Sequence, residues 1–361
     1  MPAEAHHWVI ATRRHMPDRR ATIADVAREA GVNKGTVSRA LRGIAGVGPT
    51  TRERIIATAD RLDFSASHLA TTLAGGRSRT IGIVLPTLRS WYFNEFASGA
   101  SSVLVPAGYR VELINLDVDS DDLDPESATF RRLFGELGAG RGRDALLLAG
   151  TISVERPEGE DSARVPATAA GSPLSSVPGI YIDHRAGGRM IGTHLLALGH
   201  RRIAMVDGRI PGKPDHGVWE NRSQGLRQAL QAAGLAVAHV VAAGDCHPAE
   251  GERAMTELLD RPGPRPTAVF CHSDELAFGG LAVLRRRGIR CPEDMSVAGF
   301  DGHPMAQYWG LTTVSQHASQ QGMRAAYALV DALEREGDEP VRRAEEALTV
   351  ELMVRETTGP A

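Results

Sequence analysis

Between residues 33 and 42 the chain carries amide, hydroxyl and basic side chains within the length of one short helix. Val37 and Leu41 give this predicted helix an apolar face, a second helix precedes it from Ile23, and Gly31 supplies the tight turn between them. In a helix-turn-helix of this kind the second helix enters the major groove of DNA. An arginine such as Arg39 is suited to forming two hydrogen bonds with a guanine there. The chemistry predicted for this segment is therefore recognition of bases and phosphates.

Motifs typical of catalysis are missing from the sequence. It contains no G-x-S-x-G elbow, and Gly75-Gly76-Arg77 lacks the spacing of a phosphate-binding loop. The three cysteines have no C-x-x-C spacing. No metal-binding spacing joins four histidines that stand out, which are more simply hydrogen-bonded structural residues: His184, His272, His303 and His317. The sequence thus favours binding over catalysis and predicts no metal and no cofactor.

Charge is unevenly distributed along the 361 residues, a length that suggests two or three domains. Residues 1–79 contain 13 basic and 7 acidic residues, whereas the whole chain has a formal charge of −3. Only the N-terminal part is therefore expected to meet a polyanion. The sequence has neither a run of about 18 apolar residues nor an apolar secretion signal. Together with the unpaired cysteines, this predicts a cytoplasmic protein with no membrane partner.

Two kinds of periodicity divide the chain. Thr22 is a suitable cap for the first of three short helices, and the third follows Pro49. After residue 80, helical stretches alternate with apolar runs that are typical of buried parallel strands. These runs are Ile81–Leu85, Tyr109–Leu116, Ala145–Leu148, Gly179–Ile182, Ile203–Val206, Val237–Ala242, Ala268–Cys271 and Ser296–Gly299. So many strands indicate two doubly wound α/β subdomains with a ligand site between them.

The helix-turn-helix resembles the headpiece of the lactose/galactose repressor (LacI/GalR) family, because DVA, AGV and TVSR fall in its register within residues 22–41. Further segments resemble the family's body: LGHRRIA at 198–204, RPTAVF at 265–270, PEDMSVAGFD at 292–301 and LTTV at 311–314. The resemblance runs from about residue 21 to residue 357. It implies an all-α helix-turn-helix headpiece and an α/β core like that of periplasmic binding proteins.

The resemblance also assigns DNA contacts. Lys34, Gly35 and Arg39 lie where the family reads bases, although glycine has no side chain for this purpose. Leu73 matches the leucine of the family's hinge helix that wedges between base steps in the minor groove. Positions suited to phosphate contacts or helix caps are Thr22, Asn33, Thr36 and Ser38, and Arg42 replaces the usual asparagine and adds a possible phosphate contact. For Thr22 and Asn33, capping alone is an equally good interpretation.

In the body, the resemblance implies a small-molecule effector. Arg222 lies where the family's arginine clamps the ligand, and Asp301 and Asp274 follow strands, where open α/β sheets bind ligands. We expect Asp301 to accept hydrogen bonds from ligand hydroxyls, and Asp274 either to do so or to hold the wall of the site. Aromatic and basic residues in nearby loops are the remaining candidates: Arg89, Trp91, Tyr92, Phe93, Trp219 and Trp309.

These observations predict residues 1–20 as a disordered extension, 21–63 as headpiece and 64–79 as hinge and linker. Residues 80–357 form the core, with one subdomain at about 80–179 and 318–338 and the other at about 180–314 and 339–357. The predicted function is a ligand-responsive transcriptional regulator, most simply a repressor. It binds a pseudo-palindromic operator in double-stranded DNA as a homodimer and responds to a sugar-like effector. The alternatives are a sugar-binding protein for uptake and, less readily, an enzyme.

Overall fold

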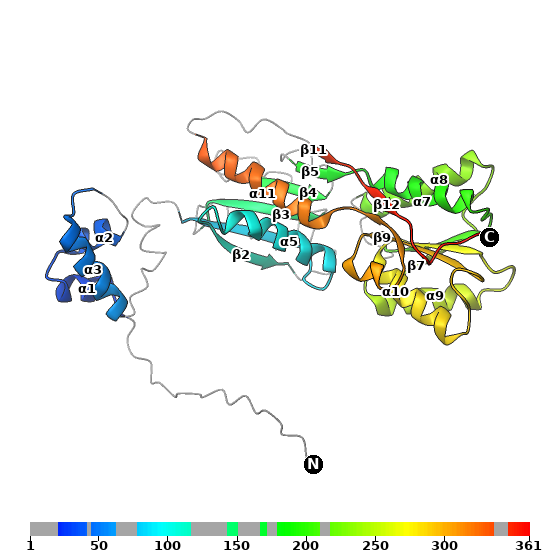
Figure 1. The fold of residues 1–361 in the computed structure, drawn as a ribbon, viewed down its shortest axis with the longest axis horizontal. Coiled ribbons are helices and arrows are strands. Elements are labelled where there is room, and N and C mark those ends of the chain that lie inside the picture. The colour runs from blue at the N-terminus through cyan, green and yellow to red at the C-terminus, as the bar shows by residue number, and fades with distance from the viewer. Residues whose placement is uncertain are drawn as a thin grey trace, which may run out of the picture. The chain divides into compact units, whose positions relative to one another are not determined.

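The computed structural model describes residues 21–41, 45–62, 78–116, 143–150, 167–171, 179–209, 217–335 and 346–361. The chain forms two compact units, Met1–Ser78 and Arg79–Ala361 (Figure 1). Arg42, Leu73 and the predicted extension at 1–20 lie outside the described residues. None of the described helices is long and apolar enough to cross a membrane.

The first unit contains three short helices, α1 (Ile23–Glu29), α2 (Lys34–Leu41) and α3 (Pro49–Arg61). Gly31 has a φ of +65°, a value that glycine adopts without strain, and it turns the chain between α1 and α2. The apolar positions of all three helices meet in one small core that includes the fully buried Val26, Val37 and Ile55. The 3.6-residue periodicity of the sequence is therefore what packs this unit together.

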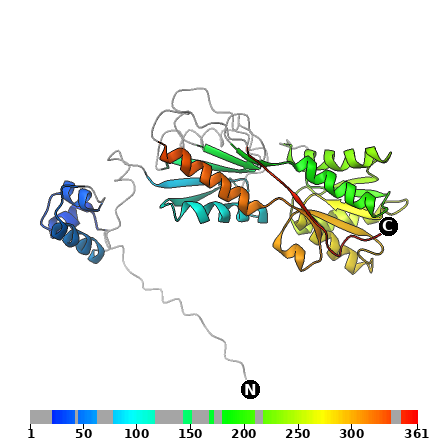
Figure 2. The ribbon, with the colours of Figure 1, turned by 45° about the horizontal axis from the view of Figure 1, so that its top comes forward.

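The second unit contains two six-stranded sheets. The strands of the first are β1 (Thr80–Leu85), β2 (Arg110–Asn115), β3 (Ala145–Gly150), β4 (Ala167–Gly171), β5 (Gly179–Ile182) and β11 (Glu346–Leu348), in the spatial order β11-β5-β4-β3-β1-β2. All their pairings are parallel. Helices α5 (Trp91–Leu104) and α11 (Ala318–Glu334) lie side by side on one face of this sheet (Figure 2).

The second sheet has the order β12-β10-β9-β8-β6-β7. Its strands are β6 (Ile203–Asp207), β7 (His239–Ala242), β8 (Ala268–Cys271), β9 (Ser296–Asp301), β10 (Thr312–Ser315) and the antiparallel β12 (Glu351–Met353). Helices α7 (His184–Ala197) and α8 (Val218–Ala232) cover one face, and α9 (Pro248–Asp260) and α10 (Asp274–Arg286) cover the other (Figure 1). A short 3₁₀ helix, η3 (Pro304–Gln307), follows β9.

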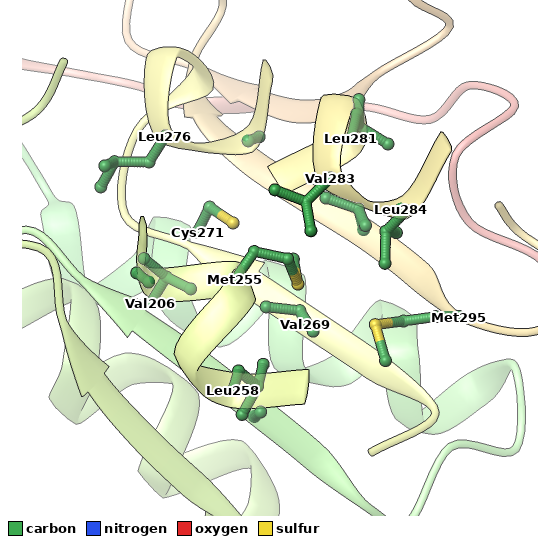
Figure 3. Close-up of a cluster of buried hydrophobic side chains, with 14 of the residues drawn as sticks. Val206, Met255, Leu258, Val269, Cys271, Leu276, Leu281, Val283, Leu284 and Met295 are labelled. Atoms are coloured by element: carbon green, nitrogen blue, oxygen red, sulfur yellow. The ribbon is translucent and has the colours of Figure 1, made fainter. Parts of the chain in front are cut away.

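Alternate residues of the second sheet enter different cores, as the two-residue period of a strand requires. Ile203 and Met205 point toward α7 and α8. Ala204 and Val206 point toward α9 and α10, where they meet Met255 and other apolar side chains (Figure 3). Both faces of each central strand are therefore buried, which explains the uninterrupted apolar runs in the sequence.

The predicted subdomain boundaries are wrong at two places. Strand β5 pairs with β4, and β11 pairs with β5, so residues 179–182 and 346–348 belong to the first sheet. From the sequence, residues from about 180 to 314 and from about 339 to 357 were expected in the second subdomain. A short apolar run carries no local signal for the sheet that it joins, because its pairing partners lie far away in the sequence. The chain therefore passes between the sheets after β5, after β10 and between β11 and β12.

Candidate functional site

Helix α2 presents the predicted DNA-reading residues on the side opposite its core contacts. Lys34, Gly35 and Arg39 are exposed, Thr36 and Ser38 are half-buried, and Val37 is completely buried against the other helices. The exposed positions of α2 are therefore the ones expected from the sequence to read bases.

Two of the predicted phosphate contacts also cap helices. The Oδ1 atom of Asn33 accepts hydrogen bonds from the Thr36 backbone N–H at 2.7 Å and from the Thr36 hydroxyl at 2.9 Å. The Thr22 backbone N–H and hydroxyl donate to Asp25 Oδ2 at 2.9 and 2.6 Å. These bonds fix the start of α1 and of α2 and leave the base-reading side of α2 free of them.

In the second unit, a buried ion pair links α8 to the end of β9. Arg222 Nη1 lies 3.2 Å from Asp301 Oδ1, and the two side chains are only 3% and 9% exposed. Arg222 also donates to the His272 carbonyl oxygen and, through Nε, to His184 Nδ1 at 3.3 Å. Gln316 Nε2 donates to the same Asp301 Oδ1 at 2.6 Å. Among the described residues, therefore, Arg222 and Gln316 both contact Oδ1 of Asp301. The Oδ2 atom is left to accept a hydrogen bond from a ligand.

Asp301 has an unusual backbone conformation and an unusual side-chain pKa. Its φ is +129°, in a region that residues other than glycine rarely adopt. Burial raises the pKa of its carboxyl group well above the usual value, while the nearby Arg222 guanidinium opposes this rise. Strained backbone and a perturbed pKa are both concentrated at binding sites.

Aromatic rings enclose the Arg222 guanidinium. It lies 3.8 Å from the centre of the Phe300 ring and 4.9 Å from that of Trp219. Trp219 is in addition stacked on His272 at 6.0 Å. Trp219 is half-buried, so part of its ring is available to a ligand.

A second buried pair lies at the ends of β6 and β8. His272 Nδ1 is 3.2 Å from Asp207 Oδ1, and Arg209 Nε donates to Asp207 Oδ2 at 2.8 Å. Burial raises the pKa of Asp207, but the hydrogen bonds from His272 and Arg209 outweigh it, and the net shift is downward. Burial lowers the pKa of His272, which leaves its imidazole uncharged at neutral pH.

Asp274 accepts hydrogen bonds from the protein on both of its carboxylate oxygens. Its Oδ1 accepts from the Thr313 hydroxyl at 2.6 Å, and its Oδ2 accepts from the His303 backbone N–H at 2.7 Å. Both oxygens are thus engaged by the protein. Burial raises the pKa of Asp274 to about 6 despite these bonds. These bonds tie the start of α10 to β10 and to the loop after β9.

Contacts across the two sheets converge on the start of α5. The Trp91 ring lies 4.7 Å from the ring of His303, which belongs to the second sheet's side. Burial raises the pKa of Glu275, on α10, to about 7, and the polar groups of Trp91 and Ser90 oppose this rise. The Tyr92 hydroxyl donates to Gln321 Oε1 at 2.9 Å. These contacts bring Trp91 next to His303, and Tyr92 lies near enough to Asp301 for this carboxylate to raise the pKa of the Tyr92 hydroxyl further, after burial.

Three other predicted ligand residues show no contact with Arg222 or Asp301 among the described residues. Phe93 packs against the core of the first sheet, and a Cβ atom on Gly150 would lie 2.7 Å from its ring. Arg89 is exposed, and its backbone N–H donates to Thr87. Trp309 is 39% exposed and contacts Phe278 at 5.7 Å. A helical or loop position fixes neither the direction nor the depth of a side chain, which is why the sequence did not distinguish these from Trp219.

Sequence reasoning missed several residues of this cluster. Asp207 and His272 each end or follow a strand of the second sheet, and this position was a usable signal. Glu275 and Gln316 were not recognisable, because only the fold brings them to α5 and Asp301. The sequence did not single out Cys246, whose thiol pKa is raised by burial and affected by the charges of Asp301 and Arg222.

Comparison with known proteins decides the family. Residues 22–67 match the sequence profile of bacterial regulatory proteins of the lacI family, and residues 193–358 match that of a periplasmic binding protein-like domain. The chain is 36% identical to the HTH-type transcriptional regulator CelR of Thermobifida fusca over 352 residues, which cover 94% of this chain and 98% of CelR. The chain belongs to the lacI family of bacterial regulatory proteins.

A further relative and two solved structures are also similar to this chain. The HTH-type transcriptional repressor CytR of Escherichia coli is 31% identical, with 94% of this chain and 96% of CytR covered. A structure of a CelR–cellobiose complex has a TM-score of 0.61 and 32% identity, covering 94% of this chain and 100% of that one. The lac repressor dimer bound to operator and the anti-inducer ONPF has a TM-score of 0.75 at 24% identity, with the same coverage, and shows the same fold.

The predictions of family, fold class and general function are thereby confirmed. The protein is a DNA-binding transcriptional regulator with a helix-turn-helix headpiece and a periplasmic-binding-protein-like core. The named relatives are regulators of transcription rather than enzymes.

Proposed function

We propose that this lacI-family protein is a repressor whose binding to an operator is controlled by a hydroxylated effector, a sugar or sugar derivative, at the Arg222–Asp301 pair. The observation that carries the proposal is the pairing of one donor and one acceptor in a nearly dry site between aromatic rings. Adjacent sugar hydroxyls offer the complementary acceptor and donor, and the C–H face of a sugar ring fits an aromatic face such as Trp219. The solved structure of a CelR–cellobiose complex, which is 32% identical to this chain, supports a carbohydrate.

At the DNA, Arg39 and Lys34 of α2 would contact bases, with Thr36 and Ser38 on phosphates and Thr22 and Asn33 fixing the helix starts. Gly35 would contribute through close approach of the backbone. Arg42 and Leu73 stay predictions for a phosphate contact and a minor-groove wedge. We propose a homodimer, because a two-fold protein matches two half-sites about one helical turn apart. Such a protein would act in the cytoplasm, where it reaches the DNA.

The proposal is tested in two steps. The purified chain first selects its operator from random or genomic DNA fragments, and binding is then measured by fluorescence anisotropy. A panel of mono- and disaccharides, including cellobiose, is screened by thermal shift. We expect at least one sugar to raise the melting temperature and to weaken operator binding by roughly 5- to 150-fold, the usual range of such coupling.

Variants locate the effector site. Asp301→Asn keeps the size of the side chain but removes its charge, and we expect it to abolish the sugar response while operator binding stays. Asp331→Asn is the matched control, because Asp331 is an exposed residue of α11 paired only with Arg335 among the described residues. A full sugar response in Asp301→Asn would show that the site is wrongly placed, and a panel without any binder would refute the sugar.

A further inference from the structure

The chain passes from the second sheet to the first through a very short crossover after β10. Strand β10 ends at Ser315 and α11 starts at Ala318, so the crossover consists of Gln316 and His317. His317 has a φ of +52°, a left-handed conformation that residues other than glycine rarely adopt. Because two residues connect the sheets here, a change in the angle between the two subdomains has to alter the backbone of this crossover.

A relay of three hydrogen bonds runs from Asp301 through the crossover to α5. Gln316 Nε2 donates to Asp301 Oδ1 at 2.6 Å. Gln321, in the first turn of α11, donates through Nε2 to the Gln316 carbonyl oxygen at 2.6 Å. The Tyr92 hydroxyl donates to Gln321 Oε1 at 2.9 Å. The side chains of Gln316 and Gln321 are buried, which shields the relay from competition by water.

Gln321 can complete the relay in one orientation only. A carbonyl oxygen accepts hydrogen bonds and cannot donate them, so the NH₂ group of Gln321 has to face Gln316. Its Oε1 atom then faces Tyr92, whose hydroxyl has to donate. If the crossover moves and α11 does not, at least one of these polar groups loses its partner. Such a loss changes an equilibrium constant by about 5- to 150-fold, which is also the usual range of coupling between two sites.

Packing between α5 and α11 does not require the amide of Gln321. Two glycines bring the helix backbones into direct contact. A Cβ atom on Gly322 would lie 2.0 Å from the Phe96 carbonyl oxygen, and one on Gly99 would lie 2.1 Å from that of Ser319. The two helices therefore pack as a pair, and an apolar side chain at position 321 would fill the same space. The buried amide thus calls for another explanation than packing.

From these observations we propose that Gln321 is a positioning residue that transmits effector binding at Asp301 to α5 and so to the operator response. This inference rests on the proposed effector site at Arg222 and Asp301. An effector that draws Asp301 toward itself pulls on Gln316, and the crossover can follow only if Gln321 moves with it or gives up a hydrogen bond. Through Tyr92 the movement reaches α5 in the first subdomain.

Gln321→Met tests the inference, with Gln320→Met as the matched control. Methionine keeps the length of the side chain but removes both hydrogen-bonding groups, and Gln320 is the exposed neighbour of Gln321 on the same helix. The probe is cellobiose, or the tightest-binding sugar of the panel if cellobiose does not bind. Its affinity for the free protein is measured by calorimetry, and its effect on operator binding by fluorescence anisotropy.

The expected result separates affinity from response. Gln321→Met should bind the sugar within about threefold of the wild type but lose at least about fivefold of the sugar's effect on operator affinity, and Gln320→Met should change neither. An undiminished sugar effect in Gln321→Met overturns the inference while leaving the proposed sugar site intact. Sugar affinity lowered by more than about threefold also overturns it, because Gln321 would then belong to the binding site itself.

A double-mutant cycle decides the inference even if no sugar in the panel binds. Tyr92→Phe removes only a hydroxyl, and Gln316→Met removes only the amide that reaches Asp301, so the relay connects the two changes through Gln321. Changes within one hydrogen-bond network are typically not additive, whereas changes at independent sites combine to within about twofold. We expect the combined change in the urea-unfolding equilibrium constant to deviate from the product of the single changes by at least about threefold.

Two controls complete the cycle. Gln321→Met should remove the deviation, because the relay is then already broken. Tyr109→Phe should show no deviation with Gln316→Met, because Tyr109 is a buried tyrosine in the core of the first sheet and not a member of the relay. Independent effects of Tyr92→Phe and Gln316→Met, or a deviation that persists in Gln321→Met, would overturn the inference.

Discussion

Replacing Arg222 by methionine should destabilise the second unit by an amount that depends on pH. Methionine keeps the length of the side chain but leaves the Asp301 carboxylate without its cation at a site where both groups are less than a tenth exposed. Breaking a buried pair in this way typically costs about 3–5 kcal/mol. The carboxyl group can escape part of this cost by taking up a proton.

Protonation of Asp301 sets the upper limit of the free energy of unfolding that the variant loses. Holding an ordinary Asp, with a pKa near 3.9, in its neutral form at pH 7 costs about 4 kcal/mol, and at pH 5 about 1.5 kcal/mol. In the variant the folded state holds this proton more tightly than the unfolded state. Its stability therefore falls as pH rises from about 4 toward the raised pKa of Asp301. We expect a loss of about 3–4 kcal/mol at pH 7 that shrinks by more than half at pH 5.

Urea unfolding followed by tryptophan fluorescence measures this loss, because Trp91, Trp219 and Trp309 all lie in the second unit. The double variant Arg222→Met/Asp301→Asn removes both charges and is the control. It should lose only about 1–2 kcal/mol, for the His272 carbonyl left without its donor, and show no extra pH dependence. A single variant as stable as the wild type, or a double variant no better than the single one, would refute the reasoning.

Three further predictions concern packing, protonation and DNA. Gly188→Ala should destabilise the second unit by about 3 kcal/mol in the same assay, because the added Cβ atom would lie 2.1 Å from the Arg222 carbonyl oxygen. Gly234→Ala is the control: its Cβ atom would have no neighbour within 4 Å, and we expect a loss of only about 1 kcal/mol, from the φ of +70°. Burial raises the pKa of Glu275 to about 7, so the free energy of unfolding of the wild type should fall as the pH rises from about 5 to 7. Glu275→Gln should remove about 2 kcal/mol of that fall, and an equal dependence of stability on pH in the variant and the wild type would contradict this. Arg39→Ala should weaken anisotropy-measured binding to the selected operator by about 1–3 kcal/mol more than binding to scrambled DNA, and an equal loss on both would argue against base reading.

Local patterns explain what the sequence could predict. The headpiece is specified by residues a few positions apart, such as the turn at Gly31 and the apolar face ending at Leu41, and the structure has its helices there. Asp301 and Arg222 were also predicted as site residues, and the fold brings them together in an ion pair. A residue at the carboxyl end of a parallel strand is placed at the ligand-binding edge by the sheet itself.

Long-range pairing explains what it could not predict. Strand β11 lies beside β5, although more than 160 residues separate them, and neither strand's composition contains that information. The same holds for Phe93 and Trp91, two positions apart on α5, of which one enters the core of the first sheet and the other meets His303. Which aromatic ring faces a ligand is decided by the packing of the whole unit.

The adjacent acidic residues at the start of α10 show how this packing can serve regulation. Asp274 fixes the loop after β9 through His303, on the second sheet's side. His303 in turn contacts the Trp91 ring at the start of α5, on the first sheet's side, and Ser90 and Trp91 affect the pKa of the neighbouring Glu275. One helical turn thus touches both subdomains next to Asp301, which the effector is proposed to contact. We expect an effector that changes the charge state or position of Asp301 to affect this turn, because Asp274 and Glu275 both act on the pKa of Asp301.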